Sequence, residues 1–249
     1  MSTPLPFARS LEDLAPTRWT VVAKVKSGNA EEALNATDRL CRMYWYPVYL
    51  FIRAHGHSHT DGQDLTQGFF EVFLNRGGFS KVDPAKGRMR NYLLTSVNHY
   101  LITVHEHAQA KKRGGGKVVM VPFDAALAED QYRTEPVDHM APDRLFQRSW
   151  ALQLLEGTFE ALRSKYADDG LDREYDTLRP MLGFSGDARD EDYAAISARV
   201  GVQVGALRVR VHRLRTEFVE LLRRTVAETL WNPTEESIND ELRVLRELV

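Results

Sequence analysis

Five basic side chains stand close together near the C-terminal end of the chain: Arg208, Arg210, His212, Arg213 and Arg215. On a helix, Arg208, His212 and Arg215 fall three or four residues apart and share one face, with the other two alongside. Guanidinium groups in such a row can contact DNA phosphates and reach guanine edges in the major groove. The spacing therefore favours a DNA-binding helix. A helical hairpin with a solvated basic face is the alternative.

Two helices would have to position this basic row. Tyr193, Ile196 and Val200 have the spacing of a short amphipathic helix, which Gly201 would end. A longer helix follows, with an inward stripe made of Leu207, Val211, Leu214, Phe218 and Leu221. A short helix, a tight turn with glycine and a longer helix form the layout of a helix-turn-helix motif, whose second helix enters the major groove.

Helical periodicity also dominates the rest of the chain, and no run alternates strictly enough to predict a strand. We therefore expect an all-α protein with two helical domains joined by an acidic, flexible linker. Prolines, a triple glycine and acidic residues mark the linker. The expected divisions are a flexible N-terminus (1–16), a first domain (17–113), the linker (114–143), a second domain (144–227) and an amphipathic tail helix (228–249).

The tail carries the signature of a helix start. Asn232 would be the N-cap, Pro233 the first helical residue, and Glu235 stands three residues after the cap. An apolar face follows, made of Ile238, Leu242, Leu245 and Val249. Packing on the second domain is the more common outcome for such a face, and binding of a regulator is the alternative.

Composition excludes several classes of protein. Cys41 is the only cysteine, which excludes a disulfide framework and a cysteine zinc site and favours a reducing cytoplasm. We find no apolar run of the ~20 residues that a membrane span needs, and no signal-peptide pattern. Alternating histidines such as His55 and His57 point to different sides of a helix and predict no metal site. No nucleophile motif is present, so we expect no catalytic residue and no cofactor.

Two consecutive stretches in the first domain are similar to conserved region two of the ECF group of the sigma-70 family. They are the aromatic stretch at 40–53 and the sequence Asp61-Gly-Gln-Asp-Leu-Thr-Gln-Gly-Phe-Phe70. In that family the acidic stretch docks on the clamp helices of the largest polymerase subunit. The resemblance implies contacts with core RNA polymerase through Asp61, Asp64, Leu65, Gln67 and Phe70.

This acidic stretch departs from the family pattern at two places. Gly68 stands where the family usually has Glu, and Gly62–Gln63 replace its usual Ala–Glu. The remaining carboxylates and the amide of Gln67 still recur three or four residues apart. One helix face can therefore offer them to a basic partner helix.

A second piece, at 83–95 and continuing to 113, resembles the helices of region two that melt the −10 promoter element. Aromatic side chains can stack on unpaired bases while basic side chains follow the backbone. The family often has Asn where this chain has His99. The residues that the resemblance assigns to −10 DNA are Arg88, Arg90, Tyr92, His99, Lys111, Lys112 and Arg113.

A third piece, Asp192–Arg215, resembles region four, which reads the −35 element. Gln203, Gly205, Arg208 and Arg210 match DNA-facing positions of the family, and His212, Arg213 and Arg215 extend the basic row. The segment 168–190 is longer than the family usually has between these helices. The three pieces together cover about 17–224, in the family's order.

The resemblance implies a cytoplasmic sigma factor that directs core RNA polymerase to promoter DNA and is not an enzyme. An anti-sigma factor or another regulator is a further possible partner, and no membrane is expected. The acidic linker would either lie in a basic polymerase channel or serve as a solvated tether. Two alternatives stay open: a helix-turn-helix regulator that never engages polymerase, and a helical interaction module that regulates another sigma factor.

Overall fold

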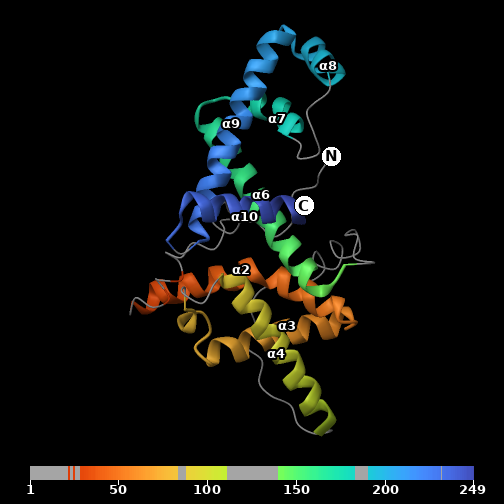
Figure 1. Ribbon diagram of the computed structural model, residues 1–249, viewed down its shortest axis with the longest axis vertical. Coiled ribbons are helices and arrows are strands. Elements are labelled where there is room, and N and C mark those ends of the chain that lie inside the picture. The colour runs from red at the N-terminus through yellow and green to blue at the C-terminus, as the bar shows by residue number, and fades with distance from the viewer. Residues whose placement is uncertain are drawn as a thin grey trace.

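The computed structural model describes residues 22, 25, 29–83, 88–110, 140–182, 190–230 and 232–249. Throughout these ranges every regular element is a helix, which confirms the all-α prediction (Figure 1). The N-terminal segment 1–16, nearly all of the acidic linker, and Lys111, Lys112 and Arg113 lie outside the described residues. Each described helix is too short or too polar to serve as a membrane span.

The first group of helices comprises α2 (Ala30–Ala54), α3 (His59–Asn75), the short 3-10 helix η1 (Gly78–Lys81) and α4 (Met89–Ala110). The side chain of Asn29 caps α2 by accepting hydrogen bonds from the backbone amides of Glu31 and Glu32. From Met43 to Ile52 every residue of α2 is buried. A helix that is apolar on all sides must be covered on all sides, and α3 and α6 both pack against it.

The second group comprises α6 (Pro142–Asp168), α7 (Asp172–Leu178), η3 (Arg179–Leu182), α8 (Asp190–Val200), α9 (Val204–Glu228) and α10 (Glu235–Leu248). The long helix α6 packs on α2 of the first group and on α9 of its own group. Its buried residues extend from Leu145 to Tyr166. The buried side chains of both groups form one connected apolar core, so the two groups are in direct contact through α6.

The tail helix α10 lies across this junction and packs on α6 and α9, as the more common outcome anticipated (Figure 1). The predicted cap is wrong by two residues, because Thr234 and not Asn232 begins the helix. The Thr234 hydroxyl accepts from the Ser237 amide at 3.2 Å, and the Ser237 hydroxyl accepts from the Thr234 amide at 2.9 Å. This reciprocal pair satisfies two backbone donors at once, which a cap at Asn232 would leave unpaired.

Candidate nucleic-acid and protein interfaces

Helix α3 presents an acidic face to solvent. Ser58 caps the helix by accepting from the Asp61 amide at 3.1 Å and donating to the Asp61 carboxylate at 2.7 Å. Asp61 and Asp64 are exposed, whereas Leu65 and Gln67 are half-buried. Glu71, which the sequence analysis did not single out, lies two turns beyond Asp64 on the same side. Its spacing of seven residues from Asp64 was the signal that could have revealed it.

The structure corrects the assignment of Phe70. Its ring is 1% exposed and lies against Phe69 with the ring centroids 5.1 Å apart. Because Phe70 belongs to the core, it can shape the α3 face only from beneath and cannot touch a partner in this conformation. Its burial could have been predicted from its hydrophobicity and its position next to Phe69, since the buried side of α3 contains both rings.

At both glycines that depart from the family pattern, Gly62 and Gly68, neighbouring side chains fill the space that a Cβ would occupy. A Cβ atom added at Gly68 would lie 2.4 Å from the Tyr100 hydroxyl, which leaves no room for Glu unless Tyr100 moves. A Cβ at Gly62 would lie 2.8 Å from Cδ of Arg53. Burial raises the pKa of Tyr100, and the nearby carboxylate of Glu71 raises it further. A larger side chain at either position would therefore require Arg53 or Tyr100 to shift.

The residues assigned to −10 DNA divide into covered and open ones. His99 is exposed on α4, and Tyr92 is half-buried with its ring 5.8 Å from that of Phe73. Arg90 is buried, with only 4% of its side chain exposed, and Arg88 is 34% exposed. The expectation of an open basic surface at these two arginines is therefore not met in this conformation. The reason lies in α10, whose Glu241 forms ion pairs with both guanidinium groups.

Helices α8 and α9 have the predicted lengths and are joined by a short turn at 201–203. Gly201 ends α8 with φ of 69°, a left-handed conformation that glycine adopts without strain. The Ser197 hydroxyl donates to the carbonyl of Val202 at 2.6 Å and braces the turn. Gln203 is exposed at the start of α9, and within the described part of the chain no atom outside its own helix lies within 4 Å of where a Cβ on Gly205 would be. The N-terminal end of α9 is therefore open to a ligand.

The apolar stripe of α9 is buried nearly as predicted. Leu207, Val211, Leu214 and Phe218 are at most 5% exposed. At the C-terminal end Leu222 is buried and Leu221 only half-buried, so the stripe shifts by one residue there. This shift follows from the 3.6-residue turn, because a stripe read at spacings of three and four drifts around the helix over several turns.

The basic residues of α9 do not form one face. A helix turns by about 100° per residue, so Arg208 and Arg210 point roughly 200° apart on opposite flanks of the buried stripe. Arg208 and His212 are exposed, and the Arg208 guanidinium lies 5.4 Å from the centroid of the Tyr193 ring. Arg210 and Arg213 face Glu174 of α7, at 3.2 Å and 4.0 Å.

Arg215 differs again from its expected role. Its Nη2 and Nε donate to the carbonyl oxygen of Met181 at 2.9 Å and 3.3 Å, so the guanidinium holds η3 against α9. Glu174 and Met181 both belong to the long segment 168–190, to which the sequence alone assigned no role. In the structure this segment supplies partners for Arg210, Arg213 and Arg215, while Arg208 and His212 stay exposed.

The predicted absence of a metal site was tested only on the described residues. They hold no group of three or more histidine, cysteine or acidic side chains that could bind a metal ion. His55, His57 and His105 line an open hollow of about 590 Å³ between the end of α2 and the second half of α4, together with the apolar Leu101 and Ile102. No family model matches the chain, and no curated protein or solved structure matches it either.

Proposed function

We propose that this protein is a sigma factor of the ECF type, which binds core RNA polymerase and directs it to promoters through −10 and −35 elements. The proposal rests on one combination of features: an exposed acidic helix face on α3 and an open helix-turn-helix in α8 and α9, carried by one packed body. A transcription factor that must hold the polymerase and the promoter at the same time needs two such surfaces.

The acidic face of α3 supplies the proposed contact with polymerase. Asp61 and Asp64 point outward from the first turns, with Gln67 and Glu71 along the same side. Opposite charge steers association with a basic helix and fixes its register, while the buried Phe69 and Phe70 keep α3 rigid. Leu65, half-buried against the core, adds an apolar contact at the edge of this face.

The start of α9 supplies the proposed −35 contact. A recognition helix inserts its N-terminal residues into the major groove, and these are Gln203, Gly205, Arg208 and His212. The unpaired amides of that helix end attract phosphate, and Gly205 allows the DNA backbone to come close. Arg210 and Arg213 lie on the flank held by Glu174 and are better placed for phosphates than for bases.

Melting of the −10 element is assigned to α4. Tyr92 and His99 provide rings that can stack on or bond to unpaired bases, and Arg88 and Arg90 provide charge for the backbone. Tyr100 is excluded from this role because its ring packs edge-on against Phe69, with centroids 5.8 Å apart. In this conformation the charge on Arg88 and Arg90 is already neutralised in part by Glu241.

Initiation from a genomic library would test the proposal. Purified protein is added to core polymerase with fragmented genomic DNA, and transcript start sites are mapped. Specific starts with a shared upstream sequence are the expected result. Core polymerase that stays as inactive as without the protein would contradict the proposal.

The substitution Asp64→Arg tests whether the acidic face of α3 is the surface that binds core polymerase. It should abolish binding to core polymerase in a pull-down, because it places a positive charge before a basic partner. The matched control is Asp168→Arg, which makes the same change at an exposed position near the end of α6. Equal losses for both variants would show a general charge effect and contradict the docking surface.

A helix-turn-helix regulator that does not engage polymerase is the second candidate. The pairing of Glu241 with Arg88 and Arg90 favours it, since it leaves α9 as the open basic surface among the described residues. This candidate predicts that the protein binds duplex DNA with full affinity while Asp64→Arg has no effect on transcription.

A further inference from the structure

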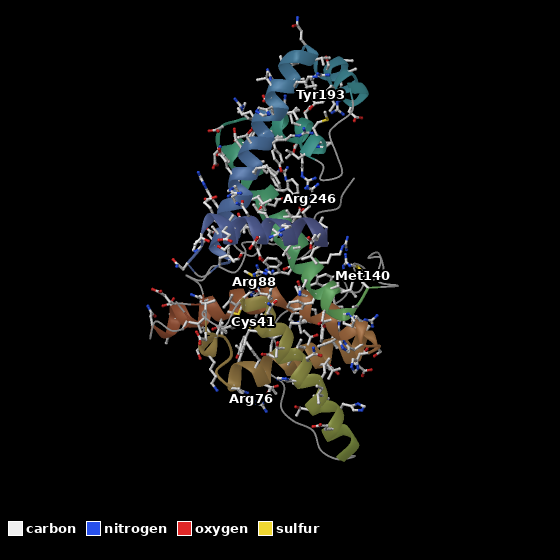
Figure 2. All side chains as sticks on the ribbon, viewed as in Figure 1. Cys41, Arg76, Arg88, Met140, Tyr193 and Arg246 are labelled. Atoms are coloured by element: carbon white, nitrogen blue, oxygen red, sulfur yellow. The ribbon has the colours of Figure 1, made fainter. Side chains whose placement is uncertain are left out.

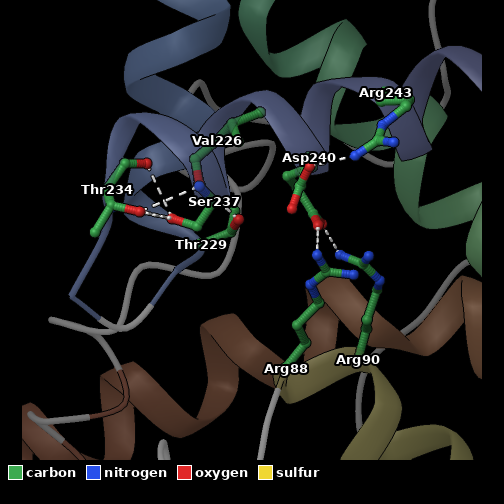
Figure 3. A network of polar contacts seen from close by, with 9 residues as sticks. Arg88, Arg90, Val226, Thr229, Thr234, Ser237, Asp240 and Arg243 are labelled. Atoms are coloured by element: carbon green, nitrogen blue, oxygen red, sulfur yellow. Dashed lines mark hydrogen bonds and ion pairs between the residues drawn. The ribbon is translucent and has the colours of Figure 1, made fainter.

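Glu241 stands at the meeting point of three helices. It belongs to α10, is 0% exposed, and forms an ion pair with Arg88 Nη2 at 2.6 Å and a second with Arg90 Nη1. The Arg90 guanidinium also lies over the ring of Trp150 on α6, 4.2 Å from its centroid. Figure 3 shows Arg88 and Arg90, at the start of α4, reaching up toward α10, so one carboxylate joins the tail to the first group of helices.

This cluster is an inefficient way to hold two helices together. Two arginines share one buried carboxylate, and the Nε atom of Arg90 finds no acceptor among the described residues. Apolar side chains of similar size often hold such a junction as firmly, because they avoid the cost of removing charges from water. An ionic contact makes sense where the same guanidinium groups have a second use, in a state in which α10 has moved away.

The remaining contacts of α10 are suited to release. Ile238 and Leu245 are buried, but the polar contacts lie at the surface. Arg223 of α9 binds Asn239 at 2.7 Å and the exposed Glu235 at 2.5 Å. The helix has 14 residues, a length at which an isolated helix is marginal in water. Once its side contacts are lost, α10 can leave as a unit.

We propose that α10 is an intramolecular lock on the −10 surface, in which the Glu241 carboxylate occupies the place of a DNA phosphate between Arg88 and Arg90. This inference rests on the proposed function, because it assigns those arginines to the melted promoter strand. The tail and the strand compete for the same two guanidinium groups. The apparent affinity for single-stranded DNA is then the intrinsic affinity multiplied by the fraction of molecules in which α10 is displaced.

The lock is tested first in the unaltered full-length protein. A single-stranded DNA of mixed sequence and about 12 nucleotides, a length within the usual footprint of such surfaces, is added to saturation. Amide hydrogen exchange is then followed across 235–248. The expected result is loss of protection in α10 when DNA is bound, with α6 unchanged. Protection of α10 that stays the same or increases would overturn the lock.

Substitutions give the second arm. Glu241→Gln should tighten binding of the same oligonucleotide at least about tenfold in fluorescence anisotropy, because it raises the displaced fraction. Glu247→Gln, a matched change at an exposed position of α10, should leave the affinity as in the unaltered protein. Glu241→Gln that binds no more tightly, although hydrogen exchange shows α10 released, would also overturn the lock.

Arg223→Ala covers the case in which Glu241→Gln does not fold. It loosens α10 from the α9 side and leaves Arg88, Arg90 and Glu241 intact. We expect a smaller gain of about twofold, as befits loss of exposed ion pairs. Failure of the lock and of the proposed function are separable. If no variant binds either the oligonucleotide or core polymerase, the proposed function is rejected. If all variants bind the oligonucleotide equally although α10 is released, only the lock is rejected.

Discussion

Arg90 and Arg208 both lie in the first turns of a helix, and the sequence assigned both to DNA: Arg90 through the family resemblance, Arg208 also through the spacing of the basic row. Their surroundings are opposite. Arg90 is enclosed between Trp150 and Glu241, which come from elements 60 and 151 residues away in the chain. Arg208 is exposed, and its guanidinium lies over the ring of Tyr193, 15 residues before it. Figure 2 shows the two settings, with Arg88 beneath α10 and Tyr193 beside the outer end of α9.

The difference shows that helical spacing places a basic side chain on its own helix but does not determine what covers it. The cover on Arg90 comes from distant elements, while the surroundings of Arg208 are local. We expect the covered Arg90 to contribute to stability and, if the proposed function holds, the exposed Arg208 to contribute to binding. The two clusters should therefore respond to the same substitution in different assays.

The largest effect should come from Arg90→Ala. It removes the ring contact with Trp150 and leaves the buried Glu241 with Arg88 alone, so we expect a loss of about 3 kcal/mol in the free energy of unfolding. Denaturant unfolding measures this change. Arg208→Ala, the same substitution at the open site, should change stability by less than about 0.5 kcal/mol. Equal destabilisation by both substitutions would contradict the difference proposed between the covered Arg90 and the exposed Arg208.

The second effect concerns binding at the open cluster. Arg208→Ala should weaken binding of the −35 duplex by ~1–3 kcal/mol if the guanidinium contacts a base. A duplex with a scrambled −35 sequence serves as the control in the same titration. An equal loss on both duplexes would mark Arg208 as a phosphate contact and would remove base reading from the open cluster.

Glu174→Ala should produce a smaller change, on the other flank of α9. It releases Arg210 from its ion pair, whereas Arg213 keeps its contact with Glu217 at 3.6 Å, so non-specific duplex binding should tighten and its dependence on salt should become steeper. Stability should fall by only ~0.2–1 kcal/mol, since the arginines of these pairs are well exposed. A salt titration of binding measures the first effect. An unchanged salt slope would show that Arg210 does not reach DNA even when released.

The smallest effect is expected at Cys41. Its rate of labelling reports whether release of α10 also exposes the core of the first group of helices. Its thiol is 3% exposed, and burial, with a minor contribution from Asp38, raises its pKa to about 12. The folded state therefore keeps the thiol protonated, and the stability that this contributes is present below about pH 9 and lost as pH rises toward about 12. At neutral pH Glu241→Gln should not change the rate of thiol labelling. Faster labelling would mean that the whole core opens with the tail.

Much of the local structure could be predicted because it depends on residues within a few positions of one another. The stripe from Leu207 to Phe218, the turn at Gly201 and the tail helix after 234 all follow from helical periodicity and backbone freedom. The exposed Asp61 and Asp64 follow equally from polarity on the outer face of an amphipathic helix. The misplaced cap at Asn232 was an error of the same short range, between two hydrophilic cap residues separated by one proline.

Tertiary packing decided the rest. Arg88 and Arg90 meet Glu241 only because α6 holds the two groups of helices together and α10 crosses their junction. In the same way Glu174 and Met181 engage Arg210 and Arg215 from outside α9, while Arg208 stays exposed. A charged side chain carries no local signal of its distant partner, since an ion pair forms through space between residues that the fold brings together. The sequence by itself determined which helices form and which faces are polar, whereas the fold decided which of those faces are free to bind.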